Sequence, residues 1–280
     1  MKTQAFFLML WWTVNASAAG MTAAMEPPPN PGTALITGSD RGIGLALVRE
    51  FASRGWQVIA TCRDPEKATD LIGFAREHST VTIEKLDVSD DAAIDALVTK
   101  LKGRPIDALV NNAGVLGDFE GQALASLDPN EFSRVLRVNS YAPLRVSAAF
   151  TRLVAASKQR KIIAISSGYG SVSSVEKIAS LGYPAAYFYA MSKAALNMGM
   201  REFAFESAPS QVITVLLAPG AVDTDMQRGI RGHMAKMGKP ISAPVLTPEA
   251  SAHSMVVTIE QLKPEQNAKF LSGDGTELPW

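Results

Sequence analysis

The chain has 280 residues, and its hydrophobic content of 47% is enough for the core of one large domain or two small ones. Its 27 basic and 27 acidic residues cancel, which argues against charge-driven binding to nucleic acid or to an anionic membrane. Cys62 is the only cysteine and the three histidines are scattered, so we expect no intrachain disulfide and no metal site.

The first thirty residues differ in pattern from the rest. Lys2 precedes an apolar stretch over 5–14, and Ala16-Ser17-Ala18 is typical of the cleavage site after a secretory signal. The apolar stretch is too short for a stable membrane span. The alternative is an upstream start codon, because Met21 or Met25 could begin translation. Under both interpretations we expect 1–30 to be a signal-like or disordered segment and 31–280 to be the domain.

Strands and helices alternate from residue 32 onward. An apolar run at 34–36 predicts a buried strand, which three glycines and a helix ending near Gly55 follow. The first half then continues as a strand at 57–61, a helix within 64–78, a strand at 81–86, a helix over 91–101 and a strand at 106–110.

The second half keeps the alternation with longer helices. We expect a helix over 128–157, a strand at 161–165, a helix over 185–207, a strand at 212–217, an irregular stretch over 221–248, a helix over 248–261 and a strand at 268–271. Repeated alternation predicts an α/β fold, in which helices cover both faces of a parallel sheet of about seven strands. No break marks a second domain, so we expect a single doubly wound domain.

A glycine turn, Thr37-Gly38-x-x-x-Gly42-x-Gly44, joins the first strand to the first helix. Such a turn presents backbone N–H groups and a helix N-terminus to a phosphate, although an ordinary strand–helix loop has the same pattern. Sheets of this kind bind ligands beyond the carboxyl ends of their strands. Five further clusters follow strands at that edge: Cys62-Arg63, Asp87-Val88, 111–114, Ser166-Ser167 and Pro219-Gly220. Their convergence predicts one ligand-binding crevice.

Two arginines favour NADP(H) over NAD(H). Arg63 follows the second strand, where a carboxylate would bind the two hydroxyls of the adenosine ribose, and Arg41 lies in the glycine turn. Guanidinium groups suit a 2′-phosphate, to which they donate charge-assisted hydrogen bonds. The alternative is a pair of solvated surface arginines.

Tyr189 and Lys193 carry the strongest chemical signal. Four residues apart, they share one face of a helix. A lysine charge there would lower the pKa of the phenol from about 10 and make it a usable proton donor or acceptor. Ser167, after the fifth strand, adds a hydroxyl that could polarise a carbonyl oxygen. A Tyr/Lys pair at this spacing also occurs on ordinary exposed helices, so the pair alone does not establish a site.

The glycine turn, Asn111-Asn112-Ala113-Gly114, Ser167, Tyr189-x-x-x-Lys193 and Pro219-Gly220 occur in this order. Together they resemble the short-chain dehydrogenase/reductase superfamily over residues 32–272. Within it, the chain is most similar to carbonyl reductases of the sniffer and C-factor type. The resemblance implies a Rossmann-type fold and an NADP(H)-dependent oxidoreductase that interconverts a carbonyl and an alcohol by hydride transfer.

The resemblance also assigns roles. Tyr189 would exchange a proton with the substrate oxygen, Lys193 would bind the nicotinamide ribose and lower the tyrosine pKa, and Ser167 rather than Ser166 would hold the carbonyl. Asn139 would complete the set through a water molecule. Besides Tyr189 and Lys193, the expected cofactor-binding residues are Gly38, Asp40, Arg41, Gly42, Ile43, Gly44, Arg63, Asp87, Val88, Asn111, Ala113, Gly114, Val222 and Thr224.

Asn139 is also supported by a physical argument, because Pro143 follows it by four residues. Proline has no N–H, so the Asn139 carbonyl loses its helical partner and we expect a kink there. The free carbonyl could hold the water that links to Lys193. The alternative is a tolerated proline with a solvated carbonyl.

Ser167 and Tyr189 are separated by an extended loop over 168–188. It contains the apolar or aromatic residues Val172, Val175, Ile178, Leu181 and Tyr183. We expect part of this loop, together with 221–248, to form the substrate pocket, and neither segment has a charged cluster, which favours an uncharged carbonyl substrate. The alternative is a surface excursion.

Other functions stay open at this point. A non-catalytic NADP-sensing protein could use the same fold, although it would not need the proton-donor set, and a 3-oxoacyl-carrier-protein reductase would act on acyl thioesters. Relatives often form homodimers through the counterparts of the two long helices, a contact that the extended loop could block. NADPH use favours the cytoplasm, whereas the signal-like residues 1–18 leave export open.

Overall fold

Seven parallel strands form the centre of the molecule, in the order β3-β2-β1-β4-β5-β6-β7. The computed structural model describes residues 31–280, so the signal-like segment lies outside the described residues. The strands are β1 (Thr33–Thr37), β2 (Gln57–Cys62), β3 (Val81–Lys85), β4 (Ala108–Asn111), β5 (Lys161–Ile165), β6 (Ile213–Ala218) and β7 (Phe270–Ser272). The strand order reverses between β1 and β4, which is where ligands bind in such sheets.

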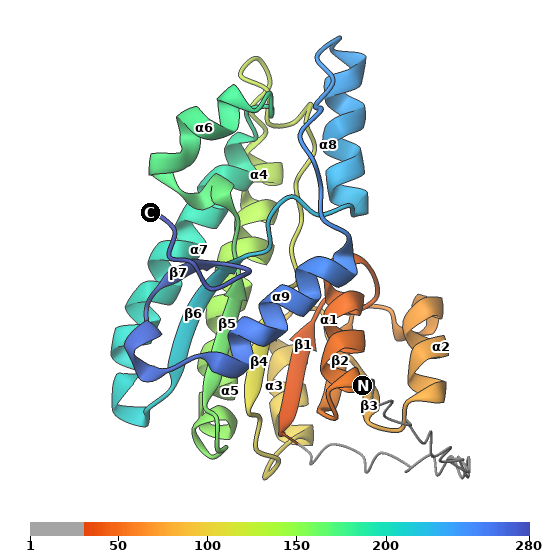
Figure 1. The fold of residues 1–280 in the computed structure, drawn as a ribbon, viewed down its shortest axis with the longest axis vertical. Coiled ribbons are helices and arrows are strands. Elements are labelled where there is room, and N and C mark those ends of the chain that lie inside the picture. The colour runs from red at the N-terminus through yellow and green to blue at the C-terminus, as the bar shows by residue number, and fades with distance from the viewer. Residues whose placement is uncertain (1–30) are drawn as a thin grey trace, which may run out of the picture.

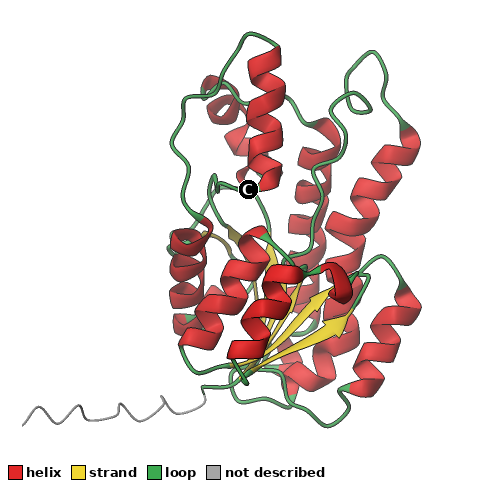
Figure 2. Cartoon of the chain, turned by 90° about the vertical axis from the view of Figure 1, so that its right-hand side faces the viewer, coloured by secondary structure: helices red, strands yellow, loops and turns green. Residues whose placement is uncertain are grey.

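Helices cover both faces of the sheet (Figures 1 and 2). One face carries α1 (Gly42–Ser53), α2 (Thr69–Glu77) and α9 (Pro248–Gln261). The other carries α3 (Asp91–Lys100), α5 (Ala142–Ala155) and α7 (Tyr187–Glu206), with α4 (Pro129–Leu136) leading into α5. Each face therefore buries its own apolar layer, as the expected doubly wound fold requires.

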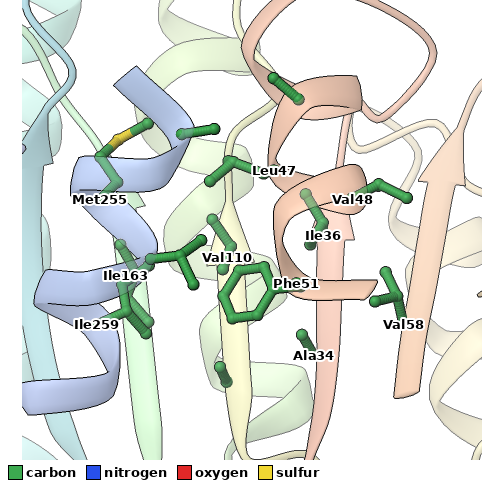
Figure 3. Close-up of a cluster of buried hydrophobic side chains, with 14 of the residues drawn as sticks. Ala34, Ile36, Leu47, Val48, Phe51, Val58, Val110, Ile163, Met255 and Ile259 are labelled. Atoms are coloured by element: carbon green, nitrogen blue, oxygen red, sulfur yellow. The ribbon is translucent and has the colours of Figure 1, made fainter. Parts of the chain in front are cut away.

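The layer under α1 and α9 shows how the pattern of apolar residues makes the core (Figure 3). Leu47 and Val48 lie four and three residues before Phe51 on α1, so all three share the face that meets the sheet. Met255 and Ile259 repeat that spacing on α9. These side chains bury almost all of their surface, and this fixes the two helices against β1 and β4.

Local signals set several helix ends as the sequence predicts. The Asp90 side chain caps α3 by accepting hydrogen bonds from the backbone N–H groups of Ala92 and Ala93. Asp128 caps α4 in the same way, and Pro129 occupies its first position. Gly55 follows α1 with φ +82°, the left-handed conformation that ends many helices.

The structure corrects three expectations. The stretch over 221–248 contains α8 (Asp225–Lys236), and the extended loop holds α6 (Val175–Ser180) after two 3₁₀ turns. The long helix over 128–157 contains a π-helical turn, Arg137–Tyr141, between α4 and α5. In Figure 1, α6 and α8 stand beyond the carboxyl ends of the strands, on either side of the space above β5 and β6.

No helix in the described part of the chain is long and apolar enough to cross a membrane.

Candidate active site

The turn between β1 and α1 needs glycine at positions 38, 42 and 44. Gly38 and Gly42 have φ of +67° and +54°, values that side chains rarely adopt. A Cβ on Gly44 would lie 2.0 Å from the carbonyl oxygen of Gly38, and one on Gly38 would lie 2.9 Å from Cα of Ala113. Arg41, at the N-cap of α1, makes no side-chain capping bond. The first N–H groups of α1 therefore face the turn without a side-chain acceptor, as an anion site needs.

The segment after β4 holds this turn in place. Asn112 Nδ2 donates to the carbonyl oxygens of Thr37 and Gly38, at 2.9 and 3.0 Å. Thr37 Oγ1 accepts from the backbone N–H groups of Asn112 and Ala113. Asn112 and Ala113 thus brace the glycine turn. The sequence analysis did not assign this bracing role to Asn112.

At the expected adenosine end, the two arginines have different partners. Arg63 lies near Asp87, at the ends of β2 and β3. Burial alone would raise the pKa of Asp87, but hydrogen bonds from Ser89 and the charge of Arg63 lower it overall. Arg41 instead lies 3.5 Å from the Asp40 carboxylate and 4.0 Å from that of Asp225. Arg63 is therefore the arginine that the structure associates with the ends of β2 and β3.

A pocket of about 510 Å³ opens between α6, α8 and the ends of β5 and β6. Five of the expected site residues line it: Ile43, Ser167, Tyr189, Val222 and Thr224. Both segments expected to form a substrate pocket also contribute, with Ile178, Leu181, Tyr183, Met226, Gln227, Ile230 and Leu246. Val172 and Val175, two other apolar residues of the extended loop, are exposed and do not line the pocket, so only part of the loop contributes, as expected.

Two serines follow β5, and the structure separates them. The buried Ser166 hydroxyl donates to Oδ1 of Asn197 at 2.5 Å and is used within the core. Ser167 is hydrogen-bonded to the Tyr189 side chain, and its Oγ accepts from the backbone N–H of Tyr169. Ser167 is therefore the serine beside the tyrosine, as the sequence predicted.

Tyr189 and Lys193 are both buried on the inner face of α7. Lys193 Nζ donates to the carbonyl oxygen of Ile165 at 2.8 Å and lies 5.8 Å from the centre of the Tyr189 ring. Gly170 packs against this part of α7, because a Cβ there would lie 2.8 Å from the carbonyl of Lys193. Of the two, Tyr189 lines the pocket, while Lys193 lies one turn further along the same face of α7.

Burial shifts both titrating groups against their charged forms. It raises the pKa of Tyr189, and the hydrogen bond with Ser167 offsets this only in part. Burial also lowers the pKa of Lys193 to about 8. The sequence analysis expected a lowered tyrosine pKa, which is wrong for this structure, because burial of the phenol has the larger effect.

Asn139 lies in the π-helical turn and is completely buried. Its Oδ1 accepts from the backbone N–H of Val115 at 2.8 Å, and its Nδ2 donates to the carbonyl of Val115 and to Ser192 Oγ. The side chain thus ties the segment after β4 to α7, one residue from Lys193. A π-helical turn widens the helix by one residue just before Pro143, where the sequence predicted a kink.

Sequence reasoning missed the residues that hold α6 and α8 over the pocket. Gln227 Nε2 donates to the Tyr183 hydroxyl at 3.1 Å and joins α8 to the loop after α6. Tyr169 donates its hydroxyl to the carbonyl of Pro184, and its ring stands edge-on to Tyr189 at 5.7 Å. Because these contacts join segments far apart in the chain, the sequence showed only that several tyrosines cluster.

Comparisons with known proteins agree with this geometry. The short chain dehydrogenase family model matches residues 32–235. An uncharacterized oxidoreductase of Schizosaccharomyces pombe is 34% identical over 255 residues, which cover 88% of this chain and 96% of the relative.

Two solved structures share the fold along most of the chain. NADPH-bound carbonyl reductase from chicken fatty liver superposes with a TM-score of 0.77 at 30% identity, covering 89% of this chain and 98% of that one. Carbonyl reductase Sniffer of D. melanogaster has a TM-score of 0.76 at 29% identity, covering 89% and 99%. The expected similarity to sniffer-type carbonyl reductases is confirmed.

Proposed function

Because this chain is an oxidoreductase of the short-chain dehydrogenase family, we propose that it interconverts a carbonyl and an alcohol by hydride transfer with NADP(H). The observation that carries the proposal is the cluster of Ser167 with the buried Tyr189 and Lys193, in which Ser167 and Tyr189 line the 510 Å³ pocket. A proton donor, a hydroxyl that can hold a carbonyl, and a cation are thus brought together where the family's chemistry needs them.

The residues present fit a dinucleotide. Glycines at 38, 42 and 44 leave the backbone open to a pyrophosphate, and the uncapped start of α1 supplies N–H donors. Arg63, close to Asp87, suits a 2′-phosphate. The similar chicken-liver reductase holds NADPH, which supports the same choice here. Ile43, Val222 and Thr224, which line the pocket, would hold the nicotinamide end.

When bound, the nicotinamide supplies or accepts the hydride. Tyr189 passes its hydroxyl proton to the substrate oxygen during reduction and takes it back during oxidation. Since its pKa is raised, the phenol is protonated at neutral pH and ready to donate. Ser167 donates a hydrogen bond to the same oxygen, and the Lys193 ammonium stabilises the tyrosinate that forms.

The rest of the lining supports an apolar substrate. Its walls carry aromatic and aliphatic side chains, including Tyr169, Ile230 and Leu278. Lys177 and Asp274 are the only charged residues among those that line the pocket. Asp274 is already engaged, since its carboxylate accepts hydrogen bonds from Ser272 and Thr276. We therefore infer an uncharged carbonyl compound rather than a phosphorylated one.

The test is turnover of activated ketones, quinones and aldehydes by purified protein with NADPH. Tyr189→Phe should lower kcat by about 10²–10⁴-fold, the usual contribution of a positioned proton donor. Tyr187→Phe, on the same helix but partly exposed, is the matched control and should leave kcat unchanged. Tight NADPH binding without any turnover would support a sensor instead, and turnover confined to acyl thioesters would support a 3-oxoacyl reductase.

A homodimer is the assembly that we propose. The outer face of α7 exposes Met191, Met198 and Phe205 at intervals of seven residues. One apolar face on a 20-residue helix suits a twofold contact with a second copy. Size-exclusion chromatography with light scattering decides between dimer and monomer.

We propose a cytoplasmic location, because NADPH serves reductions in that compartment. N-terminal sequencing of the mature protein tests this, since cleavage near Ala18 would show export instead.

A further inference from the structure

A glutamine from a loop distant in sequence caps the first turn of α7, the helix that carries Tyr189. α7 begins after Ala186, whose methyl group cannot cap the free N–H groups. The backbone N–H of Phe188 donates instead to Oε1 of Gln122, at 3.2 Å, across 66 residues of sequence. Gln122 is 1% exposed and Phe188 is 5% exposed, so water cannot take the place of this cap.

Partners on both sides orient the Gln122 amide. Its Nε2 donates to the carbonyl oxygen of Leu116 at 3.4 Å, which leaves Oε1 directed at the helix. Gly117 lies against the same amide with φ +86°, and a Cβ there would approach Val135 Cγ2 to 3.0 Å. The amide therefore has one orientation in which both of its ends are used.

The loop over 116–128 that carries Gln122 is anchored to its neighbours. The backbone N–H of Asp118 donates to Oε1 of Glu131 on α4 at 2.7 Å. On its other side, the Phe119 ring stacks on His233 of α8, with ring centres 4.1 Å apart and planes 8° apart. The 116–128 loop thus connects α4 and α8, which stand on either side of it in Figure 1, to the start of α7.

Tyr189 follows Phe188 directly, so the position of this first turn sets the position of the phenol. Helix ends open more readily than helix centres. The Phe188 ring packs on Phe132 of α4, with centres 5.2 Å apart, but a ring contact leaves rotation and sliding free. The directional hydrogen bond that the N–H of Phe188 donates to Gln122 restricts these movements.

We propose that Gln122 is a positioning residue for proton transfer, because it fixes the first turn of α7 and thereby keeps the Tyr189 hydroxyl beside Ser167. This rests on the proposed role of Tyr189 as proton donor. Gln122 lies outside the residues that line the pocket, so it acts through the helix and not on the substrate.

The test compares Gln122→Leu, which loses the acceptor, with Gln122→Glu, which keeps one. In Gln122→Leu we expect kcat to fall about tenfold, KM and the Kd of NADPH to stay within twofold, and the solvent deuterium isotope effect on kcat to rise. The isotope effect rises because a displaced phenol makes proton transfer slower. Gln122→Glu should keep kcat within threefold of the unaltered protein, since a buried carboxyl that keeps its proton can donate to the Leu116 carbonyl and still accept from the N–H of Phe188.

Two further measurements separate positioning from folding. Ile259→Val, in the core under α9, is the control for a loss of stability alone and should leave kcat unchanged below its melting temperature. Hydrogen exchange at 187–190 reports the cap directly and should speed up about tenfold in Gln122→Leu.

The proposal is overturned if Gln122→Leu keeps the kcat of the unaltered protein, if Gln122→Glu falls as far as Gln122→Leu, or if exchange at 187–190 does not change. An unaltered protein that reduces no carbonyl compound would instead overturn the proposed function, and exchange at 187–190 would still decide whether the cap exists.

Discussion

Lys193 combines two properties that usually exclude each other, burial and charge. Its ammonium has one hydrogen-bond acceptor, the carbonyl of Ile165, and burial lowers its pKa to about 8. A lysine that keeps its charge only in part near neutral pH is a poor structural choice. Because Lys193 lies beside Tyr189, its charge can assist proton transfer. Burying that charge lowers the free energy of unfolding.

We therefore expect Lys193→Met to abolish turnover and to stabilise the fold at pH 7. A pKa lowered from 10.5 to about 8 destabilises the native state by about 3 kcal/mol. Loss of the hydrogen bond to the Ile165 carbonyl lowers the free energy of unfolding of the variant by about 1–2 kcal/mol. We therefore expect a net gain of about 1–2 kcal/mol in the free energy of unfolding. Urea unfolding at pH 7 measures it.

The gain in stability from Lys193→Met should become smaller as the pH rises. Below about pH 8 the native state must bury the charged ammonium, so the full cost is present. As the pH rises from 8 toward 10.5, the folded lysine is neutral and the unfolded one loses its proton too, so the cost disappears. The difference between Lys193→Met and the unaltered protein should therefore shrink above pH 8. A difference that stays constant to pH 10 would show that burial of charge is not its cause.

Arg63 should decide between the two nicotinamide cofactors. Arg63→Asp removes a donor for a 2′-phosphate and adds a negative charge close to Asp87. We expect the Kd of NADPH to rise about 10–100-fold while that of NADH changes little, which corresponds to about 1.4–2.8 kcal/mol. Fluorescence titration with both cofactors measures the ratio. Arg104→Asp is the control for net charge, and an unchanged ratio in Arg63→Asp would exclude the assignment.

Residue types at fixed spacing, read together with the family resemblance, predict which side chains meet at the proposed site. Tyr189 and Lys193 share a helical face in any α-helix, and Ser167 must follow β5, so their meeting needs only the fold. Gln122 and Gln227 could not be found in this way, because their partners Phe188 and Tyr183 lie 66 and 44 positions away and one member of each pair is in an irregular segment. The tyrosine pKa was predicted with the wrong sign because burial is a property of the folded chain.

At the scale of elements, the π-helical turn Arg137–Tyr141 explains how one helix accommodates both Asn139 and Pro143. The proline ring clashes with the carbonyl four residues earlier in a regular helix. An extra residue in the turn relieves that clash and rotates Asn139 relative to α5. The buried amide can then meet both Val115 and Ser192.

Pro143→Ala should allow a regular helix through this region and move the Asn139 side chain away from Ser192. We expect kcat to fall about tenfold, with the Kd of NADPH within about twofold, because Asn139 contacts α7 and not the glycine turn. Steady-state kinetics and NADPH titration separate the two effects. Unchanged turnover would show that the π-helical turn has no part in arranging the site.

Regular spacing of apolar residues made most helices and strands predictable. Elements without that spacing were not predicted. The strand at 161–165 and the helix at 248–261 were predicted residue for residue, because apolar spacing and Pro248 mark them clearly. α8 was missed because Gly229 and Gly232 lower its helix propensity, and packing of Ile230 and Met234 against Ile241 supplies the missing stability. Tertiary contacts that no local pattern contains decide such elements.

At the scale of the whole molecule, the sheet and its two helical layers begin at Thr33. The carbonyl of Pro31 accepts a hydrogen bond from Gln159. The core clusters are built from residues 34–280, so we propose that 31–280 forms the short-chain dehydrogenase domain.

We therefore expect a protein of residues 31–280 to melt within about 2 °C of the full chain, since its core is unchanged. NADPH at 100 times its Kd should stabilise both proteins by about 2.7 kcal/mol. Differential scanning calorimetry with and without NADPH measures both effects. A shortened protein that melts earlier by more than this, or that responds less to NADPH, would place part of the first 30 residues in the fold.

The pocket wall closes with residues that come late in the chain. Leu278 lines the pocket and its backbone N–H donates to Phe270 on β7, while Ser173 donates to the main-chain oxygen of Trp280. The glycine turn, in contrast, is complete once residues 33–114 have been made. During synthesis on the ribosome, the glycine turn can thus form well before the pocket for the substrate. At that stage the growing chain has the turn for the pyrophosphate, but it still lacks Lys193, Val222 and Thr224, which we propose for the nicotinamide end, and the wall that encloses the substrate.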